Sequence, residues 1–414
     1  MAADGTDRYW LHLLLFGATL ITTLMAGAEF LTAGAWLGGL VPGARQLGLA
    51  DLGQGLPFAL AFLAFLSTHE FGHYFAARWH GVRCSLPYYI PVFIPIPGIL
   101  NIGSFGAVIR IRERPRSTRQ YFDIGIAGPL AGAVISIGLL LQGFLSLPPP
   151  EYVLSMNPDY LPEFGGVPSR AELLARYGAV PELGNSLLFW LMESTLPDPA
   201  RMPNHLELFH YPFLFVGYLT LFFTALNLLP IGQLDGGHVS FGLFGARRAA
   251  LLSRVFILGL IAYGGLGILD FSSPYWPIPV ALYALYLFWV LPPLVQRDYP
   301  LAIALGGGIV GLQLLLQTLL PGPQTPYVLW LLYALLATRV IRPDHPPVAQ
   351  QQPLSRKRRL LGCLALVLFV LCFSPRPVRI ARAAEAPAKP PPAPTEQPTQ
   401  TVQAAHTASF PPSR

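Results

Sequence analysis

Three ionisable residues lie within five positions of one apolar stretch, as His69, Glu70 and His73 in the order His-Glu-x-x-His. On a helix, residues four apart share a face, so both imidazoles can bind one Zn²⁺ while Glu70 acts as general base toward water. Ionisable groups are costly inside a membrane-length apolar run unless they have partners. We therefore predict a catalytic zinc site rather than the alternative, a helix end with ordinary satisfied polar side chains.

A third protein ligand is needed, because catalytic zinc usually binds three protein side chains and water. His80 follows His73 too closely to be an extended third ligand. Far downstream, 227–238 reads Asn-Leu-Leu-Pro-Ile-Gly-Gln-Leu-Asp-Gly-Gly-His, where an aspartate precedes two glycines that leave the backbone free to turn. We predict Asp235 as the third ligand, with His238 as the alternative.

The composition is that of a membrane protein. Hydrophobic residues make up 53% of the 414, charged residues only 12%, and the mean hydropathy is +0.50. Soluble domains carry about 25% charged residues. Repeated apolar stretches long enough to cross a bilayer predict an all-α polytopic fold. The expected spans are 10–31, 56–79, 122–147, 208–229, 250–270, 277–295, 300–320 and 326–341, with a shorter one at 360–373.

The charged residues between these spans indicate the orientation of the chain. Arginines cluster after the second span, after the fourth span and just before 360–373, whereas 148–207 is acidic. The positive-inside rule then places the N-terminus and the basic segments in the cytoplasm and 148–207 outside. The net charge of +6 thus reflects topology, and no nucleic-acid partner is expected. The same orientation places His69, His73 and Asp235 at one depth, on the cytoplasmic side.

Two segments do not fit a regular helix. Prolines 87, 91, 95 and 97 interrupt the segment 82–121, which continues with a tendency to alternate at its end, so we predict a re-entrant or interfacial, β-hairpin-like element in this segment. From 376 to 414 the chain is rich in Pro and Ala and is predicted to be disordered. The basic run 356–359 before 360–373 leaves two interpretations open, a last short span or an internal signal peptide.

With these residues in view, the chain resembles the site-2 protease family of intramembrane zinc metalloproteases. That family has His-Glu-x-x-His in one helix and Asn-x-x-Pro-x-x-x-x-Asp-Gly in a later one, and Asn227, Pro230, Asp235 and Gly236 fall in register with the second pattern. A third familiar stretch, 122–132, opens the helix between them. The resemblance covers about 60–240 and implies a three-helix catalytic core.

The resemblance also implies a function. It implies Zn²⁺ as cofactor and regulated cleavage of a peptide bond within or near a transmembrane segment of a membrane-protein substrate. Asn227 would hold the unwound substrate or stabilise the oxyanion, and the 99–112 hairpin would pair with the substrate as an added strand. The segment 148–207 is too short and too rich in Pro and Gly for a PDZ domain, so none is predicted. The pattern is closer to the PDZ-less relatives of bacteria and plastids.

These observations give the expected organisation of the chain. An N-terminal helix and loop (1–55) precede a metalloprotease core (56–245), C-terminal transmembrane helices (246–345), a basic segment with the short span (346–375) and the tail (376–414). The expected partners are the lipid bilayer and a transmembrane substrate, and the expected location is a bacterial inner membrane. A transporter would explain the composition but not a glutamate between two helix-spaced histidines. An inactive relative is disfavoured by the intact Glu70.

Overall fold

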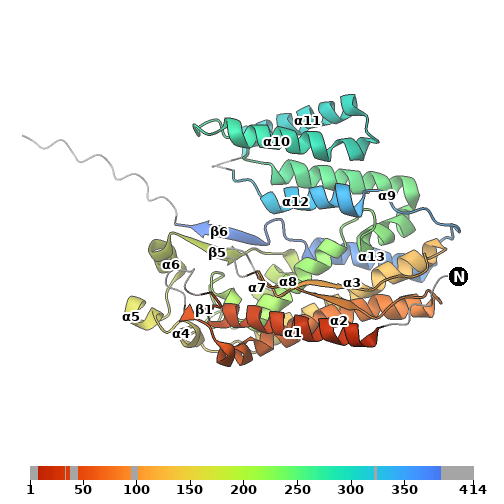
Figure 1. Ribbon diagram of the computed structural model, residues 1–414. Coiled ribbons are helices and arrows are strands. Elements are labelled where there is room, and N and C mark those ends of the chain that lie inside the picture. The colour runs from red at the N-terminus through yellow and green to blue at the C-terminus, as the bar shows by residue number, and fades with distance from the viewer. Residues whose placement is uncertain (1–7, 33, 38–44, 95–100, 321–323, 384–414) are drawn as a thin grey trace, which may run out of the picture.

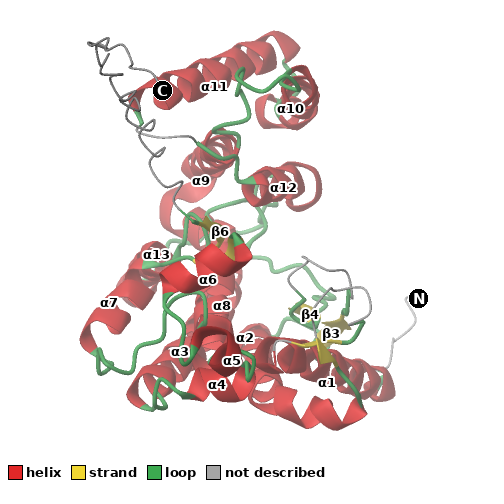
Figure 2. Cartoon of the chain, turned by 90° about the vertical axis from the view of Figure 1, so that its left-hand side faces the viewer, coloured by secondary structure: helices red, strands yellow, loops and turns green. Residues whose placement is uncertain are grey.

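The computed structural model describes residues 8–32, 34–37, 45–94, 101–320 and 324–383. Residues 99 and 100 of the predicted hairpin, and 384–414 of the predicted tail, lie outside these ranges. The fold is mostly helical, with the helices stacked in layers (Figures 1 and 2). Long helices are α1 (Tyr9–Thr32), α2 (Leu56–Trp79), α3 (Thr118–Leu145), α9 (Asp235–Gly264) and α11 (Tyr299–Leu319).

Shorter helices complete the described architecture. They are α8 (Pro212–Asn227), α10 (Pro277–Val290), α12 (Val328–Leu336), α13 (Arg356–Cys372) and, within 148–207, α4 (Tyr152–Met156), α5 (Tyr160–Phe164), α6 (Arg170–Tyr177) and α7 (Leu187–Thr195). Short 3₁₀ segments η2 (Leu49–Gly55), η3 (Leu208–His210) and η4 (Pro292–Val295) precede α2, α8 and α11, and the π-helical η5 (Ala337–Ile341) extends α12. In Figure 1, α10 and α11 form one outer layer, α9 and α12 the next, and α1 and α2 the opposite side.

Five described helical segments are long and apolar enough to cross a membrane: Tyr9–Thr32, Leu49–Trp79, Thr118–Leu145, Pro277–Val295 and Tyr299–Leu319. They correspond to the first three, the sixth and the seventh expected spans. The fourth and eighth spans appear as the shorter apolar helices Pro212–Asn227 and Val328–Ile341. The fifth falls in the second half of α9, which is interrupted at Gly245, where φ is 77°.

The prediction of an all-α fold with one hairpin was incomplete. The described chain contains three two-stranded sheets: β1 (Gly34–Ala35) with β2 (Arg45–Gln46), β3 (Tyr88–Pro91) with β4 (Ser104–Val108), and β5 (Ala179–Leu183) with β6 (Val378–Arg382). The first is parallel and the other two are antiparallel. The hairpin is thus β3–β4, extended by a Cys84–Ile111 bridge, and it begins before the predicted 99–112. Proline is accommodated in β3 because a two-stranded sheet consists of edge strands.

The tail predicted to be disordered from residue 376 begins with an ordered strand. All five residues of β6 pair with β5. Glu182 of β5 is only 2% exposed, and its carboxylate accepts hydrogen bonds from Arg170 and from Arg379 of β6. A buried carboxylate requires cationic partners, and Arg379 supplies one. Composition alone could not indicate this pairing, because the partner strand lies almost 200 residues away in the sequence.

Helices α2, α3 and α8 pack against one another. Close approach depends on glycine: a Cβ added to Gly72 of α2 would lie 2.7 Å from the carbonyl oxygen of Ala127 in α3. Gly217 of α8 is similarly pressed against Leu140 of α3, with 2.7 Å from an added Cβ to Leu140 Cδ2. In a membrane the hydrophobic effect does little to bring helices together, so helix contacts depend on close packing. Small residues at the contacts let the backbones approach closely. The result is a closely packed group of helices in which polar side chains can meet.

Candidate metal centre

The two histidines of the His-Glu-x-x-His pattern lie on one helix. α2 has Pro57 in its first turn, where the missing N–H costs nothing, and continues to Trp79. Four residues separate His69 and His73, so their rings lie on the same face, with centroids 4.7 Å apart. Both side chains are buried, as is Glu70. The sequence prediction of one helix carrying two adjacent imidazoles is confirmed.

The aspartate comes to the histidines on a tight turn. After α8 the chain reverses through 228–234, where Gly232 has φ of 44°, and Asp235 is the first residue of α9. A Cβ on Gly236 or Gly237 would collide with backbone oxygens of that turn, so only glycine fits after Asp235. The unpaired N–H groups at the start of a helix favour a carboxylate there.

These three side chains form a triangle of potential ligand atoms. His69 Nε2 and His73 Nε2 are 3.0 Å apart, and Asp235 Oδ2 lies 3.6 Å and 3.3 Å from them respectively. Donors at about 2.0–2.2 Å from a tetrahedral zinc lie roughly 3–4 Å from one another. One ligand atom from each residue lies within 4.8 Å of the others, which is the arrangement of a group able to hold a metal ion. The nitrogen, nitrogen and carboxylate donors fit zinc in type and in spacing.

The orientation of His73 is fixed from behind. Its Nδ1–H donates a hydrogen bond of 2.7 Å to the carbonyl oxygen of Ile124 in α3, which leaves Nε2 facing His69 and Asp235. Such a bond from the second ring nitrogen is how ligating histidines are usually positioned. Gly128 of α3 lies directly against the ring, because a Cβ there would be 2.5 Å from His73 Cδ2 and Cε1. On His69, Nδ1 is buried without a hydrogen-bond partner in the described chain.

Glu70 borders the triangle without forming part of it. The backbone N–H of Ile109, just after β4, interacts with the Glu70 carboxylate. One turn earlier on α2, Ser67 Oγ lies 2.7 Å from Tyr89 Oη of β3. The β3–β4 hairpin therefore lies beside the helix that carries both histidines. This agrees with the expected neighbourhood of hairpin and metal centre, with the corrected boundaries.

The remaining candidates have distinct environments. Asn227 is the last residue of α8 and half-buried, and its side chain makes no hydrogen bond to any described residue. The alternative ligand His238 lies one turn after Asp235, but its Nδ1 is 2.8 Å from Nε2 of His345. His345 in turn stacks on Phe241, with ring centroids 3.9 Å apart. His238 is thus engaged with His345 and is not part of the ligand triangle.

Sequence reasoning missed two residues next to this centre. Gly128 belongs to a Gly-x-x-x-Gly pattern that predicts only helix packing, and nothing in the pattern shows that an imidazole fills the space. His345 lies in a polar segment far along the chain, and no motif links it to His238. Both gaps have the same cause: the contacts are between segments distant in sequence.

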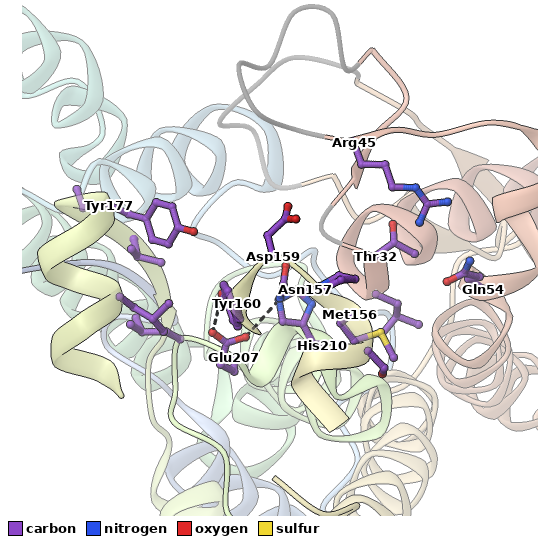
Figure 3. A pocket seen from close by; sticks show the side chains of 17 residues that line it. Thr32, Arg45, Gln54, Met156, Asn157, Asp159, Tyr160, Tyr177, Glu207 and His210 are labelled. Carbon is purple, nitrogen blue, oxygen red and sulfur yellow. Dashed lines mark hydrogen bonds and ion pairs between the residues drawn. The ribbon is translucent and has the colours of Figure 1, made fainter. Parts of the chain in front are cut away.

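A second polar group lies on the other side of the molecule, in 148–207 and η3 (Figure 3). It surrounds a cavity of about 730 Å³. Glu207 is 3% exposed, and Tyr160 Oη donates to its Oε1 at 3.0 Å. His210 donates to the Phe30 carbonyl at 2.6 Å and lies 3.5 Å from Glu207 Oε2. Burial raises the pKa of Glu207 to about 7.

Comparison with known proteins places the chain among peptidases. The family model for peptidase family M50 matches residues 57–265, about half of the chain, and these residues contain His69, Glu70, His73 and Asp235. No solved structure matches the chain.

Individual relatives come from plants. The chain is 32% identical over 244 residues to "Probable zinc metalloprotease EGY1, chloroplastic" of Oryza sativa subsp. japonica, covering 59% of this chain and 36% of the relative. It is 33% identical over 212 residues to the Arabidopsis thaliana protein of the same name, covering 51% and 34% respectively. The matched region thus spans about a third of each relative's length. Both relatives are named chloroplastic, so they lend no support to a bacterial inner membrane.

Proposed function

We propose that this chain, which belongs to peptidase family M50, is a zinc metalloendopeptidase of the site-2 protease type. Its substrate is a membrane protein, and the bond hydrolysed lies within or near a transmembrane segment of that protein. The observation that carries the proposal is the buried triangle of His69 Nε2, His73 Nε2 and Asp235 Oδ2, with separations of 3.0–3.6 Å and Glu70 at its border. The plant relatives named as probable zinc metalloproteases support the choice of metal.

The chemistry divides between three ligands and one base. Zinc, when bound by His69, His73 and Asp235, supplies Lewis acidity for the peptide carbonyl and for water. Glu70 accepts a proton from the attacking water and delivers it to the nitrogen of the leaving amine as the C–N bond breaks. The backbone N–H of Ile109 lies at its carboxylate and helps to position it for this transfer. The hydrogen bond from His73 Nδ1 to Ile124 keeps Nε2 directed at the metal position.

The substrate is proposed to lie along β4. A peptide bond in a helix is shielded by its own backbone hydrogen bonds, so the substrate segment must be locally extended before attack. Within the described chain β4 pairs only with β3, and Phe105 and Val108 are exposed on it. An extended segment added beside β4 would gain main-chain hydrogen bonds close to Glu70. Asn227, at the end of α8 with no described partner for its amide, is the proposed group for holding the substrate carbonyl.

The proposed setting is a membrane crossed several times by the chain. Helices α2, α3 and α8 are the proposed catalytic core within 56–245, and the basic segments lie on the side of the metal centre. Five described segments have the length and composition of membrane spans, which supports this setting. The Arg110–Arg116 region and the Arg247–Arg248 pair then face the compartment into which the cleaved segment is released.

The test separates ligand from base. Full-length protein purified in detergent is analysed for metal, then reconstituted with a reporter protein that has one transmembrane segment. His69→Ala or His73→Ala should lose both zinc and cleavage, whereas Glu70→Gln should keep zinc and lose cleavage. Robust cleavage by Glu70→Gln protein would refute the assignment of the base. A zinc content unchanged by His69→Ala and His73→Ala would refute the metal centre, and an ion-transport function would then be favoured.

A further inference from the structure

Two adjoining cavities lie next to the metal centre, between the segment before α3 and the C-terminal helices. Their volumes are about 990 Å³ and 940 Å³, and both are lined by Gln296, Arg297, Asp344 and His345. We call them together the arginine cavity, after the basic residues that line it. These are Arg114, Arg247, Arg254, Arg297, Arg339 and Arg342.

The positive charge of the arginine cavity is not balanced from within the protein. Of its two acidic residues, Asp344 pairs with Arg254 at 2.9 Å, and Asp298 accepts the Leu301 N–H at the start of α11. In the larger of the two cavities, the side chains of three arginines form no ion pair or hydrogen bond with the residues the structure describes. These are Arg114, Arg297 and Arg342. Three unpaired guanidinium groups around one cavity are a site for an anion.

Unusual backbone conformations are concentrated at the same place. In the described chain, the non-glycine residues with positive φ are Gln296 at 54°, Arg297 at 66° and Arg342 at 67°. All three line the arginine cavity. Positive φ is unfavourable for residues with a Cβ and tends to persist at binding sites, where it directs particular side chains. Here the positive φ angles orient two arginines, Arg297 and Arg342. This backbone observation is independent of the number of unpaired charges.

One wall of the arginine cavity is formed by residues adjacent to the metal centre. Its wall includes Gln233 and His238, which flank Asp235 in sequence, and Ile111, whose bridge to Cys84 extends the β3–β4 hairpin. The Arg342 carbonyl lies so close to Gly232 that an added Cβ would collide with it. His345 contacts His238 at 2.8 Å. A chain leaving the metal centre along the hairpin would therefore enter this cavity.

We infer that the arginine cavity binds an acidic segment of the substrate, located on the metal-centre side of its transmembrane segment. This inference rests on the proposed function and specifies its substrate class. The arginines come from separate segments before α3, in α9, after η4, and in and just after η5, and they line two adjoining lobes. Charges distributed in this way match carboxylates spaced along a peptide better than a single phosphate group. Substrates with Asp and Glu next to the membrane are thus retained and aligned.

The experiment measures binding without requiring cleavage. The probe is a fluorescein-labelled twelve-residue peptide of Asp, Glu, Gly and Ser, titrated by anisotropy with full-length Glu70→Gln protein in detergent at low salt. Saturable binding is expected. Each exposed charge pair changes an affinity by up to about fivefold. The triple variant Arg114→Gln, Arg297→Gln, Arg342→Gln should therefore bind the peptide roughly tenfold or more weakly.

The matched control removes arginines from the same end of the molecule. Arg356→Gln with Arg359→Gln alters two exposed residues that do not line the cavity, and the affinity for the peptide should be unchanged. A second comparison changes only the peptide and keeps the six cavity arginines. Replacing Asp and Glu of the peptide by Asn and Gln should abolish its binding to Glu70→Gln protein. This comparison stands even where the triple variant fails to fold.

Three results would overturn the inference. One is equal binding of the acidic and the amide peptides, and another is equal affinity of the triple and the control variant. The third is binding of pyrophosphate or ATP to the same arginines at concentrations well below those the peptide needs, which would identify a phosphate site. Zinc content and cleavage of the reporter are measured separately. Failure of the protease assignment would therefore leave the binding result intact, and the reverse also holds.

Discussion

Replacing Gly128 by alanine tests how closely α3 must approach the metal centre. The added methyl would lie 2.5 Å from two ring carbons of His73 and nearer still to Nε2. Ordinary van der Waals contact begins at 3.4 Å, so the imidazole must move by roughly 1 Å or more. Metal–ligand distances tolerate only about 0.2 Å. Because the Ile124 carbonyl holds the other ring nitrogen, the ring cannot shift and still keep both contacts.

The expected consequence is loss of metal with retention of the fold. Changes to groups that merely support a ligand cost about 10–100-fold in metal affinity, so displacing His73 itself should cost at least ~100-fold. Gly138→Ala is the matched control, because it lies on the same helix and its added Cβ would meet nothing within 4 Å. Gly132→Ala should be intermediate, since its Cβ would lie 2.8 Å from Phe65 Cε2 but 3.3 Å from His69 Nδ1.

The assay is competition with a zinc chelator of known affinity, combined with thermal denaturation in detergent. We expect Gly138→Ala to match the unaltered protein in both measurements. Gly128→Ala should lose zinc although its fold is retained. In the absence of zinc, its melting temperature should be close to that of the unaltered protein without zinc. Wild-type zinc affinity in a folded Gly128→Ala protein would refute the packing of His73 against α3. It would also refute His73 as a ligand held in this position.

Two other outcomes follow from the geometry. Asp235→Ala should lower zinc occupancy, whereas His238→Ala should leave it nearly unchanged because His238 is engaged with His345. The reverse result in metal analysis would identify His238 as the third ligand. Burial raises the pKa of Glu207 from 4.5 to about 7, so ionisation destabilises the folded state increasingly as pH rises through this interval, by up to about 3 kcal/mol. Glu207→Gln should therefore raise the melting temperature relative to the parent at pH 8 but not at pH 4.5, and an equal difference at both pH values would contradict this account.

Local patterns predicted the parts of the metal centre that helix geometry determines. The spacing of His69 and His73 places them on one face of any helix, and the structure confirms it. Asp235 required two further arguments, the depth expected from the charge distribution and the family pattern, and its carboxylate does lie beside the histidines. The roles of these residues, and of Glu70 and Asn227, remain predictions.

What the sequence could not predict depends on contacts between distant segments. The pairing of β5 with β6 joins residues separated by almost 200 positions, and neither strand has a strong pattern of its own. The bounds 99–112 left out β3, because its Pro91 is unfavourable inside sheets but tolerated at an edge. The spans at α8 and α12 proved shorter than predicted mainly at their starts. α8 begins at Pro212, after the 3₁₀ segment η3, and the helix Val328–Ile341 begins two residues later than expected.

The course of α13 determines where the last described strand of the chain lies. Arg358 in its first turn pairs with Asp123 near the start of α3 at 2.7 Å, and β6 after its end pairs with β5, in the segment that follows α3. α13 therefore runs beside α3 in the same direction, and contacts near both of its ends tie it to α3 and to the segment that follows α3. A tag attached after residue 383 would therefore start beside β5, away from the Arg358–Asp123 pair near the start of α3.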